Sequence, residues 1–522
     1  MKNLNTFYTP ITIGNHLMRI RTLFFSCLLG LSTIVSSAPW VDTNDAGLRA
    51  DIQLLSDTGV LNIPVTTYPL MWSSISPHIK NIDPNSLSSS QFNAFIHLRR
   101  KVNALNSKSI NNKASLYLSS NERRFTSFGS SDFERSTASI SSEYTGENFS
   151  GKLQINYNKA YNLTTNQDKQ DLDGSYIAYR YANWVMDIGA VDKWWGPGFD
   201  TSLILSTNAR PLPAISIKRD NTLPFDTPWL SWIGPWNFTA QIAHLEHDRF
   251  VPDAKLWNSR ATFKPFKRLE LGLSWSYQWG GKGQPETLND FVRGLLGRTE
   301  CVDGSDNCGE ELETKLGNQL AGFDGRWADT ILGTPYAIYA QSIGEDSPSP
   351  GTLQITDKAF LYGIETQFSI GEQQILMNFE YSDTQVSCAS AEDTSQDCYY
   401  EHSIYRSGYR YNQRSIGSTY DNDAETNTLT LIGRQVNQNS WLIKLKNSKL
   451  NTNDRDRFPN NSLLGNSVSK VAENITQLTF EYHLILDTDR LTLGSTLSQS
   501  KINLETEKDY NFYLKYEYNF TE

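Results

Sequence analysis

The stretch Leu-Glu-Leu-Gly-Leu-Ser-Trp-Ser-Tyr-Gln-Trp, residues 269–279, alternates apolar and small or polar side chains along its whole length. Successive side chains of a β-strand point to opposite faces, so this period of two predicts a strand with one apolar face and one polar face. The stretch also has the length of a tilted strand that crosses a bilayer, roughly 9–11 residues.

The same alternation recurs from about residue 113 to the end of the chain, for example in 151–158, 476–486 and 510–520. A soluble antiparallel sheet with one wet face would show the same pattern. The lengths of the segments and the aromatic residues at their ends favour a transmembrane barrel, whose apolar outer band is flanked by aromatic girdles. We therefore predict an all-β transmembrane barrel.

The links between these segments alternate in length. Short links such as 182–183 and 370–372 are followed by long polar ones such as 193–212 and 383–426. Short periplasmic turns and long extracellular loops are the rule in outer-membrane barrels, and counting with this parity predicts about 18 antiparallel strands between Ser115 and Phe520. Two links fit less well: 220–235 is long for a periplasmic turn, and 383–426 could contain a further hairpin.

Residues 1–37 have the features of an export signal. Met18 to Arg21 carry two positive charges, 22–35 is apolar, and small residues precede Ala38. The apolar run is too short for a spanning helix, so we expect a cleaved signal peptide.

Two helices are expected before the barrel. Residues 45–58 place apolar side chains on one face and are followed by Gly59, a typical helix stop. Ser88 to Gln91 resemble a capping box before a second amphipathic segment that extends to Leu105. We therefore expect a small periplasmic helical bundle over 38–112, joined by a proline-punctuated connection at 63–84, and the barrel over 113–522.

The cysteines agree with export. Cys27 lies in the expected signal peptide, and the other four form two close pairs, for which Cys301–Cys308 and Cys388–Cys398 is the simplest of three possible connectivities. Disulfides persist outside the cytosol. A zinc site is the alternative, but the spacings of seven and ten without a histidine pair argue against it.

Composition and motifs exclude several functions. The net charge of −10 argues against a nucleic-acid binder, which needs a basic face. We find no nucleophile elbow, phosphate loop or zinc-protease motif, and we predict neither an enzyme nor a bound metal or cofactor. His244 and His247 are three positions apart, so on a continuous strand they would point to opposite faces and share a ligand poorly.

Two stretches resemble the capsule assembly protein Wzi family. The first is AGLRADIQLLSDTGV at 46–60, continuing to PVTTYPLMW at 64–72. The second, which is longer and more distinctive, is DKWWGPGFD at 192–200, continuing through SLILSTNARP at 202–211. The resemblance implies an 18-stranded outer-membrane barrel with a periplasmic helical bundle, and a lectin that holds exported capsular polysaccharide at the cell surface.

Sugar recognition needs flat apolar faces and fixed polar groups, and an acidic polymer adds a need for Arg or Lys. The second motif supplies these residue types in one expected loop: Lys193, Trp194, Trp195, Asp200, Asn208 and Arg210. The alternative is that 196–198 forms a tight structural turn and that the Trp pair packs inside the barrel.

A second candidate surface is rich in Tyr and Arg. It includes Tyr405, Arg406, Tyr409 and Arg410, which could stack on sugars and pair with uronate groups. A strand with a polar lumenal face is the alternative for this run.

The resulting prediction is a monomeric outer-membrane lectin of a diderm, Gram-negative bacterium. Its expected partners are capsular or other extracellular polysaccharide, outer-membrane lipid and, through 510–520, the barrel assembly machinery; nucleic acid is not among them. The alternative function is a diffusion porin, against which a lumen blocked by helices and loops would count. An outer-membrane hydrolase ranks third, because it would need convergent titratable residues at the rim.

Overall fold

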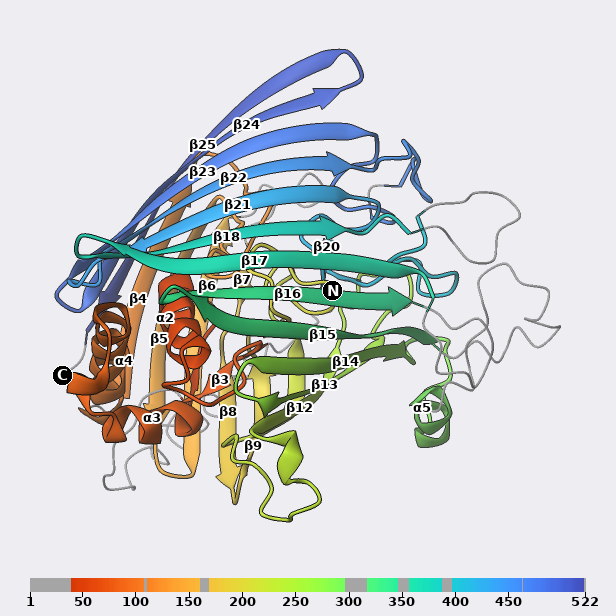
Figure 1. The fold of residues 1–522 in the computed structure, drawn as a ribbon. Coiled ribbons are helices and arrows are strands. Elements are labelled where there is room, and N and C mark those ends of the chain that lie inside the picture. The colour runs from red at the N-terminus through yellow and green to blue at the C-terminus, as the bar shows by residue number, and fades with distance from the viewer. Residues whose placement is uncertain are drawn as a thin grey trace, which may run out of the picture.

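The computed structural model describes residues 39–107, 110–159, 169–295, 317–345, 356–386, 397–461 and 463–520. Within these residues, eighteen antiparallel wall strands form a closed barrel, as the sequence predicted (Figure 1). The last strand, β25 (Glu505–Asn519), pairs with the first, β4 (Ile110–Ser119), and closes the cylinder. The short β7 (Lys169–Asp171) and β8 (Tyr176–Tyr181) both pair with β6 and together make one wall position. The expected signal peptide lies outside the described residues.

The other wall strands follow in chain order around the barrel. They are β5 (Ser136–Thr145), β6 (Phe149–Lys159), β9 (Trp184–Ala190), β11 (Pro213–Arg219), β12 (Trp236–His244), β13 (Lys255–Phe266), β14 (Leu269–Trp279), β15 (Gly317–Ile331), β16 (Thr334–Glu345), β17 (Lys358–Ile370), β18 (Gln373–Asp383), β21 (Glu425–Arg434), β22 (Ser440–Leu450), β23 (Glu473–Leu486) and β24 (Asp489–Ile502).

Alternation sets the two faces of each strand. On β14 the even residues are buried toward the lumen, whereas the odd residue Leu273 is 56% exposed on the outside. On β13, Asn258 and Arg260 are buried in the lumen at 0% and 1% exposure. An apolar exterior around a polar interior is the arrangement that a bilayer demands of a barrel.

Two helices lie where the sequence predicted them, with ends that differ by one or two residues. Helix α2 (Ala46–Asp57) begins after Asp45, whose carboxylate accepts a hydrogen bond from Leu48 N at 2.9 Å. Helix α4 (Ser89–Ser107) begins with the expected capping box, in which Ser88 N donates to Gln91 Oε1 at 2.8 Å. These side chains satisfy N–H groups that have no partner inside the helix.

Helix α3 (Trp72–Asn81) corrects the predicted connection at 63–84. It contains Pro77, a residue that lacks an N–H and normally breaks a helix. The helix persists because Ile75 and Ile79 are buried in the apolar cluster between α2 and α4. The next element is a short 3-10 helix, η1 (Pro84–Ser86).

The barrel is filled by the chain itself, and we call this filling the plug. The plug combines the N-terminal segment 39–72 with inward parts of the loops 120–135, 191–212 and 397–424. Strand β10 (Trp194–Trp195) pairs with β2 (Thr67–Tyr68) inside the barrel. An N-terminal segment and a loop after β9 therefore meet in the lumen. Small pairs complete the plug: β1 (Trp40–Val41) with β3 (Leu70–Met71), and β19 (Arg410–Tyr411) with β20 (Arg414–Ser415).

Two carboxylates of the wall hold the plug. Glu270 on β14 accepts hydrogen bonds from Val65 N at 2.8 Å and Thr66 N at 2.9 Å. Glu380 on β18 accepts from Phe199 N at 2.7 Å and from Thr201 N at 3.0 Å. Backbone N–H groups buried without a sheet partner need such acceptors, so Glu270 holds the N-terminal segment of the plug and Glu380 holds the loop after β9.

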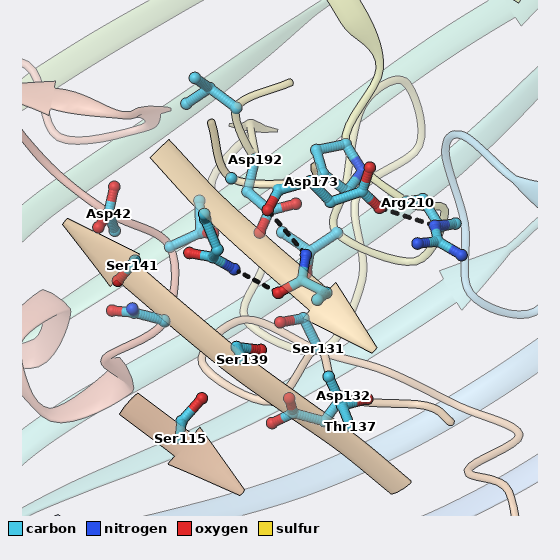
Figure 2. Close-up of a pocket in the computed structure, with 18 of the residues that line it drawn as sticks. Asp42, Ser115, Ser131, Asp132, Thr137, Ser139, Ser141, Asp173, Asp192 and Arg210 are labelled. Atoms are coloured by element: carbon cyan, nitrogen blue, oxygen red, sulfur yellow. Dashed lines mark hydrogen bonds and ion pairs between the residues drawn. The ribbon is translucent and has the colours of Figure 1, made fainter. Parts of the chain in front are cut away.

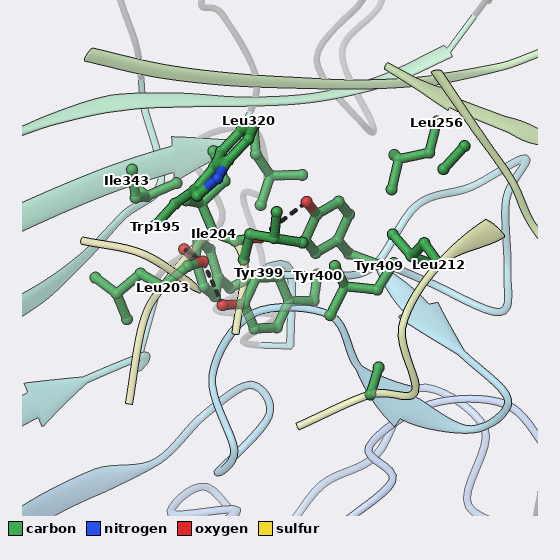
Figure 3. Close-up of a cluster of buried hydrophobic side chains, with 14 of the residues drawn as sticks. Trp195, Leu203, Ile204, Leu212, Leu256, Leu320, Ile343, Tyr399, Tyr400 and Tyr409 are labelled. Carbon is green, nitrogen blue, oxygen red and sulfur yellow. Dashed lines mark hydrogen bonds between the residues drawn. The ribbon is translucent and has the colours of Figure 1, made fainter. Parts of the chain in front are cut away.

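The apolar core of the loops includes Leu256, Leu320 and Ile343, which lie near the ends of β13, β15 and β16 that are opposite helix α4 (Figure 1). Here Trp195, Leu203 and Ile204 pack against Tyr399, Tyr400 and Tyr409 (Figure 3). The Tyr409 hydroxyl donates to Ile204 O at 2.9 Å. We call this end the long-loop end and the opposite one the short-turn end.

The two links that fitted the parity less well, 220–235 and 383–426, add no wall strand among their described residues. Among its described residues, 383–426 does contain a further hairpin, formed by β19 and β20, but this hairpin belongs to the plug and adds no strand to the wall. The link 220–235 is a turn extended by the 3-10 helix η2 (Ser231–Ile233). None of the helices in the described residues is both long and apolar enough to cross a membrane.

Candidate functional site

A polar cavity of about 230 Å³ lies between the plug and the wall formed by β4, β5, β6 and β7 (Figure 2). The wall contributes hydroxyl and amide side chains. They are Ser115, Thr137, Ser139, Ser141, Gln154, Asn156 and Asn158. Every second residue of these strands faces the lumen, so the polar half of the alternation builds this surface.

The plug supplies the opposite wall of the cavity. It contributes Asp42 from the N-terminal segment, Asp132 and Glu134 from the loop after β4, and Asp192 from the loop after β9. Burial, together with repulsion from Asp42, raises the pKa of Asp192 to about 6. The wall also brings the lysines Lys113, Lys152 and Lys515 to the cavity, so it combines neutral hydrogen-bonding groups with carboxyl and ammonium groups.

Arg210 marks the long-loop end of the cavity. Its Nε lies 2.7 Å from Asp173 Oδ2, its Nη2 contacts Asp171, and its Nη1 lies 4.0 Å from Glu134. Figure 2 shows Arg210 and Asp173 joined across this part of the cavity. One guanidinium thus ties β7, the turn after β7 and the loop after β4 to the loop after β9.

The arrangement is equipped for recognition by hydrogen bonds. Hydroxyl, amide and carboxylate groups offer both donors and acceptors to a hydroxyl-rich ligand. Within the described residues, no group of three or more His, Cys, Asp or Glu side chains is arranged to hold a metal ion.

Comparison with known proteins identifies the family. A family model described as capsule assembly protein Wzi matches residues 106–512, more than half of the chain. The chain belongs to the capsule assembly protein Wzi family. This is a family of assembly proteins, in agreement with the prediction that the chain is not an enzyme.

Two relatives extend this result. Over 346 residues the Wzi-family chain is 32% identical to an uncharacterized 55.8 kDa protein in the cps region of Klebsiella pneumoniae; the match covers 66% of this chain and 65% of that relative, just under two thirds of its length. The solved structure of Wzi from Escherichia coli superimposes with a TM-score of 0.77 at 25% identity, covering 94% of this chain and all of that one. That protein is described as a carbohydrate-binding outer-membrane β-barrel involved in group 1 capsule assembly. The present Wzi-family chain is likewise an outer-membrane β-barrel.

The Trp pair of the distinctive Wzi-family motif is buried. Trp194 is 1% exposed and donates from its indole nitrogen to Gly198 O at 2.9 Å, and Trp195 is 0% exposed. The packing alternative considered for these residues matches this burial. Neither ring offers a free face on which a sugar could stack.

The other motif residues hold the plug together. Lys193 is buried, and this burial lowers its pKa to about 8. Asp200 lies 2.8 Å from Lys444 Nζ. Burial acts to raise the pKa of Asp200, but Lys444 and Lys446 hold it below its usual value. Of the predicted residues of this motif, only Arg210 lines the cavity.

Asn208 and the Tyr/Arg run are also mostly structural. Asn208 Nδ2 donates to Ser415 O at 2.9 Å. Tyr405 and Tyr409 are each 1% exposed, and Arg410 pairs with Asp421 at 2.7 Å inside the plug. They belong to the plug and not to a wall strand, so the alternative of a strand with a lumenal face does not describe them.

Arg406 is the exception in that run. It is exposed at the long-loop end, and its guanidinium carbon lies 4.9 Å from the ring centroid of Phe250. Phe250 is 48% exposed. Together they form an aromatic and cationic surface that is open to solvent.

His244 and His247 lie close together at the end of β12. His244 Nε2 and His247 Nδ1 approach the same residue, Asp253, at 3.7 and 2.9 Å. The expected separation of the two histidines was wrong, because β12 ends at His244 and strand geometry no longer applies beyond it.

Cys398 is disulfide-bonded, whereas the other cysteines lie outside the described residues, so both pairings stay predictions.

Sequence reasoning missed the wall of the cavity. Ser115, Thr137, Ser139 and Ser141 are ordinary polar residues of alternating strands, and only their lumenal side could have been predicted. The gap between them and the plug depends on how the loops fold inward, which no local pattern reveals.

Proposed function

We propose that this Wzi-family protein binds an exported polysaccharide at the cell surface and holds it there during capsule assembly. The polymer approaches from the long-loop end, which we place outside the cell, and engages the cavity at Arg210. The observation that carries the proposal is a cavity between the plug and the wall that is lined by hydroxyl, amide, carboxylate and cationic side chains.

The plug supports a binding role over a diffusion channel. Besides the β2–β10 pairing, Gly129 N donates to Thr43 O at 2.9 Å, and Gly196 N donates to Thr66 O at 2.9 Å. Loops from one end are thus bonded to the N-terminal segment through the interior. Solute flow would require these buried hydrogen bonds to break together, so a porin is the less favoured function.

The packing of the long loops supports the same conclusion. Tyr399, Tyr400 and Tyr409 are buried, and the hydroxyl groups of all three donate to backbone carbonyls of Leu203 or Ile204. A surface held in one conformation loses little entropy on binding, which favours recognition of a flexible polymer.

Family membership adds independent support. The Wzi structure from Escherichia coli is described as carbohydrate-binding, and the present chain shares its fold over nearly the full length. On the strength of this shared fold we extend carbohydrate binding to the present protein as a proposal.

The direct test is binding of the purified barrel to surface polysaccharide from its own host. Wild type is expected to bind, and Arg210→Ala is expected to bind at least several-fold more weakly. The matched control is Arg268→Ala, because Arg268 lies on the turn after β13 at the short-turn end and its side chain is 59% exposed. Equal loss in both variants, or no binding by wild type, would contradict the proposal.

The cellular test concerns attachment. Deletion of the gene should release polymer into the medium without reducing the total amount made. Unchanged attachment in the deletion strain would sink the proposed role, whatever the binding assay shows.

A further inference from the structure

Helix α5 (Leu288–Leu295) lies on the outside of the barrel, beside the long-loop end of β14 (Figure 1). It begins with a capping box, in which Thr287 N donates to Asp290 Oδ2 at 2.9 Å and Asp290 N donates to Thr287 Oγ1 at 3.3 Å. The helix is thus a defined element of the connection that follows β14.

One side of α5 is packed on the outer wall. The Phe291 ring centroid lies 4.7 Å from that of Trp279 and 5.6 Å from that of Trp257. Tyr277 and Trp279 occupy outward positions of β14, yet they are only 0% and 5% exposed, because α5 covers them. Aromatic residues at the end of an outward face mark the interfacial girdle of a membrane barrel.

The seat of the helix is specific. A Cβ at Gly294 would lie 2.1 Å from Cζ of Tyr277, so only glycine allows this approach. Gln319, an outward residue of β15, donates from Nε2 to Gly294 O at 2.8 Å. Both contacts fix α5 at the height of the girdle.

A second side of α5 is apolar and uncovered. Leu288 and Val292 are four residues apart, which places them on one face, and they are 78% and 44% exposed. The remaining face carries Asn289 and Arg293, which are exposed and polar. The helix therefore has a wall side, an apolar side and a polar side.

We propose that α5 is an interfacial helix whose Leu288 and Val292 insert into the outer leaflet of the membrane. The apolar side continues the lipid-facing surface of the wall. This surface includes Leu273, which lies on β14 further from the long-loop end and is 56% exposed. A short amphipathic helix at the girdle buries its apolar side at the boundary of headgroups and acyl chains and keeps its polar side in water. Because the apolar side of α5 adjoins the lipid-facing exterior of the barrel, we expect lipid to cover it.

The test places a spin label on a single introduced cysteine in the full-length mature protein, reconstituted in phosphatidylethanolamine and phosphatidylglycerol vesicles. Labels at Leu288→Cys and Val292→Cys are compared with Asn289→Cys on the polar side and Leu273→Cys on the wall. Spectra of the unsubstituted protein give the background from native thiols. The measured quantity is the ratio of collision with oxygen, which concentrates in lipid, to collision with a water-soluble nickel complex.

Positions 288 and 292 are expected to give ratios several-fold above that of 289 and closer to that of 273. Ratios equal to that of 289 would overturn the proposal, since the helix would then lie in water. Low collision with both reagents at 288 and 292 would also overturn it, because a protein surface would then cover this side. All four labelled positions are exposed, so the labels should not disturb packing.

Discussion

The guanidinium carbon of Arg49 lies 4.0 Å from the ring centroid of Phe199. Arg49 belongs to helix α2, which begins at the short-turn end, whereas Phe199 belongs to the loop after β9. Arg49 Nη2 also donates to Pro197 O at 2.7 Å, and the Phe128 ring lies 4.4 Å away. A single buried cation therefore joins the N-terminal segment to two loops from the opposite end.

Arg49→Ala should loosen this junction. The change removes a fully buried side chain, and we expect a loss of about 2–5 kcal/mol, the usual range when a large core side chain becomes alanine. Arg49→Met fills most of the volume without a charge and should cost much less, since Nε and Nη1 have no hydrogen-bond partner among the described residues. The stability of both variants is measured as the urea midpoint of unfolding in detergent, with unfolding detected by gel mobility. Equal stability of Arg49→Ala and wild type would contradict the role of this contact.

Glu270→Ala should free the segment around Val65. The change leaves Val65 N and Thr66 N without their acceptor, at about 1–3 kcal/mol for each unsatisfied donor. Amide hydrogen exchange of 63–68 should accelerate by about tenfold or more. The control is Glu372→Ala, an exposed carboxylate in the turn after β17. Unchanged exchange in the Glu270 variant would show that the wall does not hold this segment of the plug.

Loss of both wall carboxylates should open the lumen. In planar bilayers we expect wild type to show no sustained large currents, because the plug is bonded from both ends. The double variant Glu270→Ala, Glu380→Ala should show frequent openings, since Glu380 holds Phe199 and Thr201 in the same way. Large steady currents from wild type would favour a porin over the proposed role.

Glu401 should make stability depend on pH. Burial, only partly offset by Arg410, raises its pKa from 4.5 to about 7. The folded protein then binds more protons than the unfolded chain between these values, so this group makes stability fall as pH rises from 4.5 to 7. The full cost, up to about 3 kcal/mol, is present above pH 7.

The variant Glu401→Gln lacks this titration. It should match wild type at pH 5 and exceed it at pH 8 in the temperature at which half of the barrel unfolds. A wild-type advantage at pH 8 would mean that the charged Glu401 stabilises Arg410 more than burial costs. Glu401 lies in the plug, so the substitution should change this unfolding temperature without changing the pairing of the wall strands in the folded protein.

Alternation and capping were visible in the sequence because they are local. The period of two in 269–279 determines which side chains point outward and which point into the lumen, whatever the rest of the chain does. Asp45 and Gln91 begin their helices through groups three residues away. The length of the links then orders the strands, so the barrel and its strand number followed from the sequence, whereas α3 did not, because tertiary burial of Ile75 and Ile79 overrides the effect of Pro77.

The interior was decided only by tertiary structure. Trp194 and Trp195 have the composition of a sugar-binding surface, but their pairing with Tyr68 and Thr67 places them in the plug. The partners lie more than a hundred residues apart, and nothing in either segment specifies that a loop from one end meets a segment from the other inside a cylinder. The sequence by itself determined the cylinder, through local patterning. The closed lumen, and the cavity left beside Arg210, depend on contacts that exist only once the cylinder has formed.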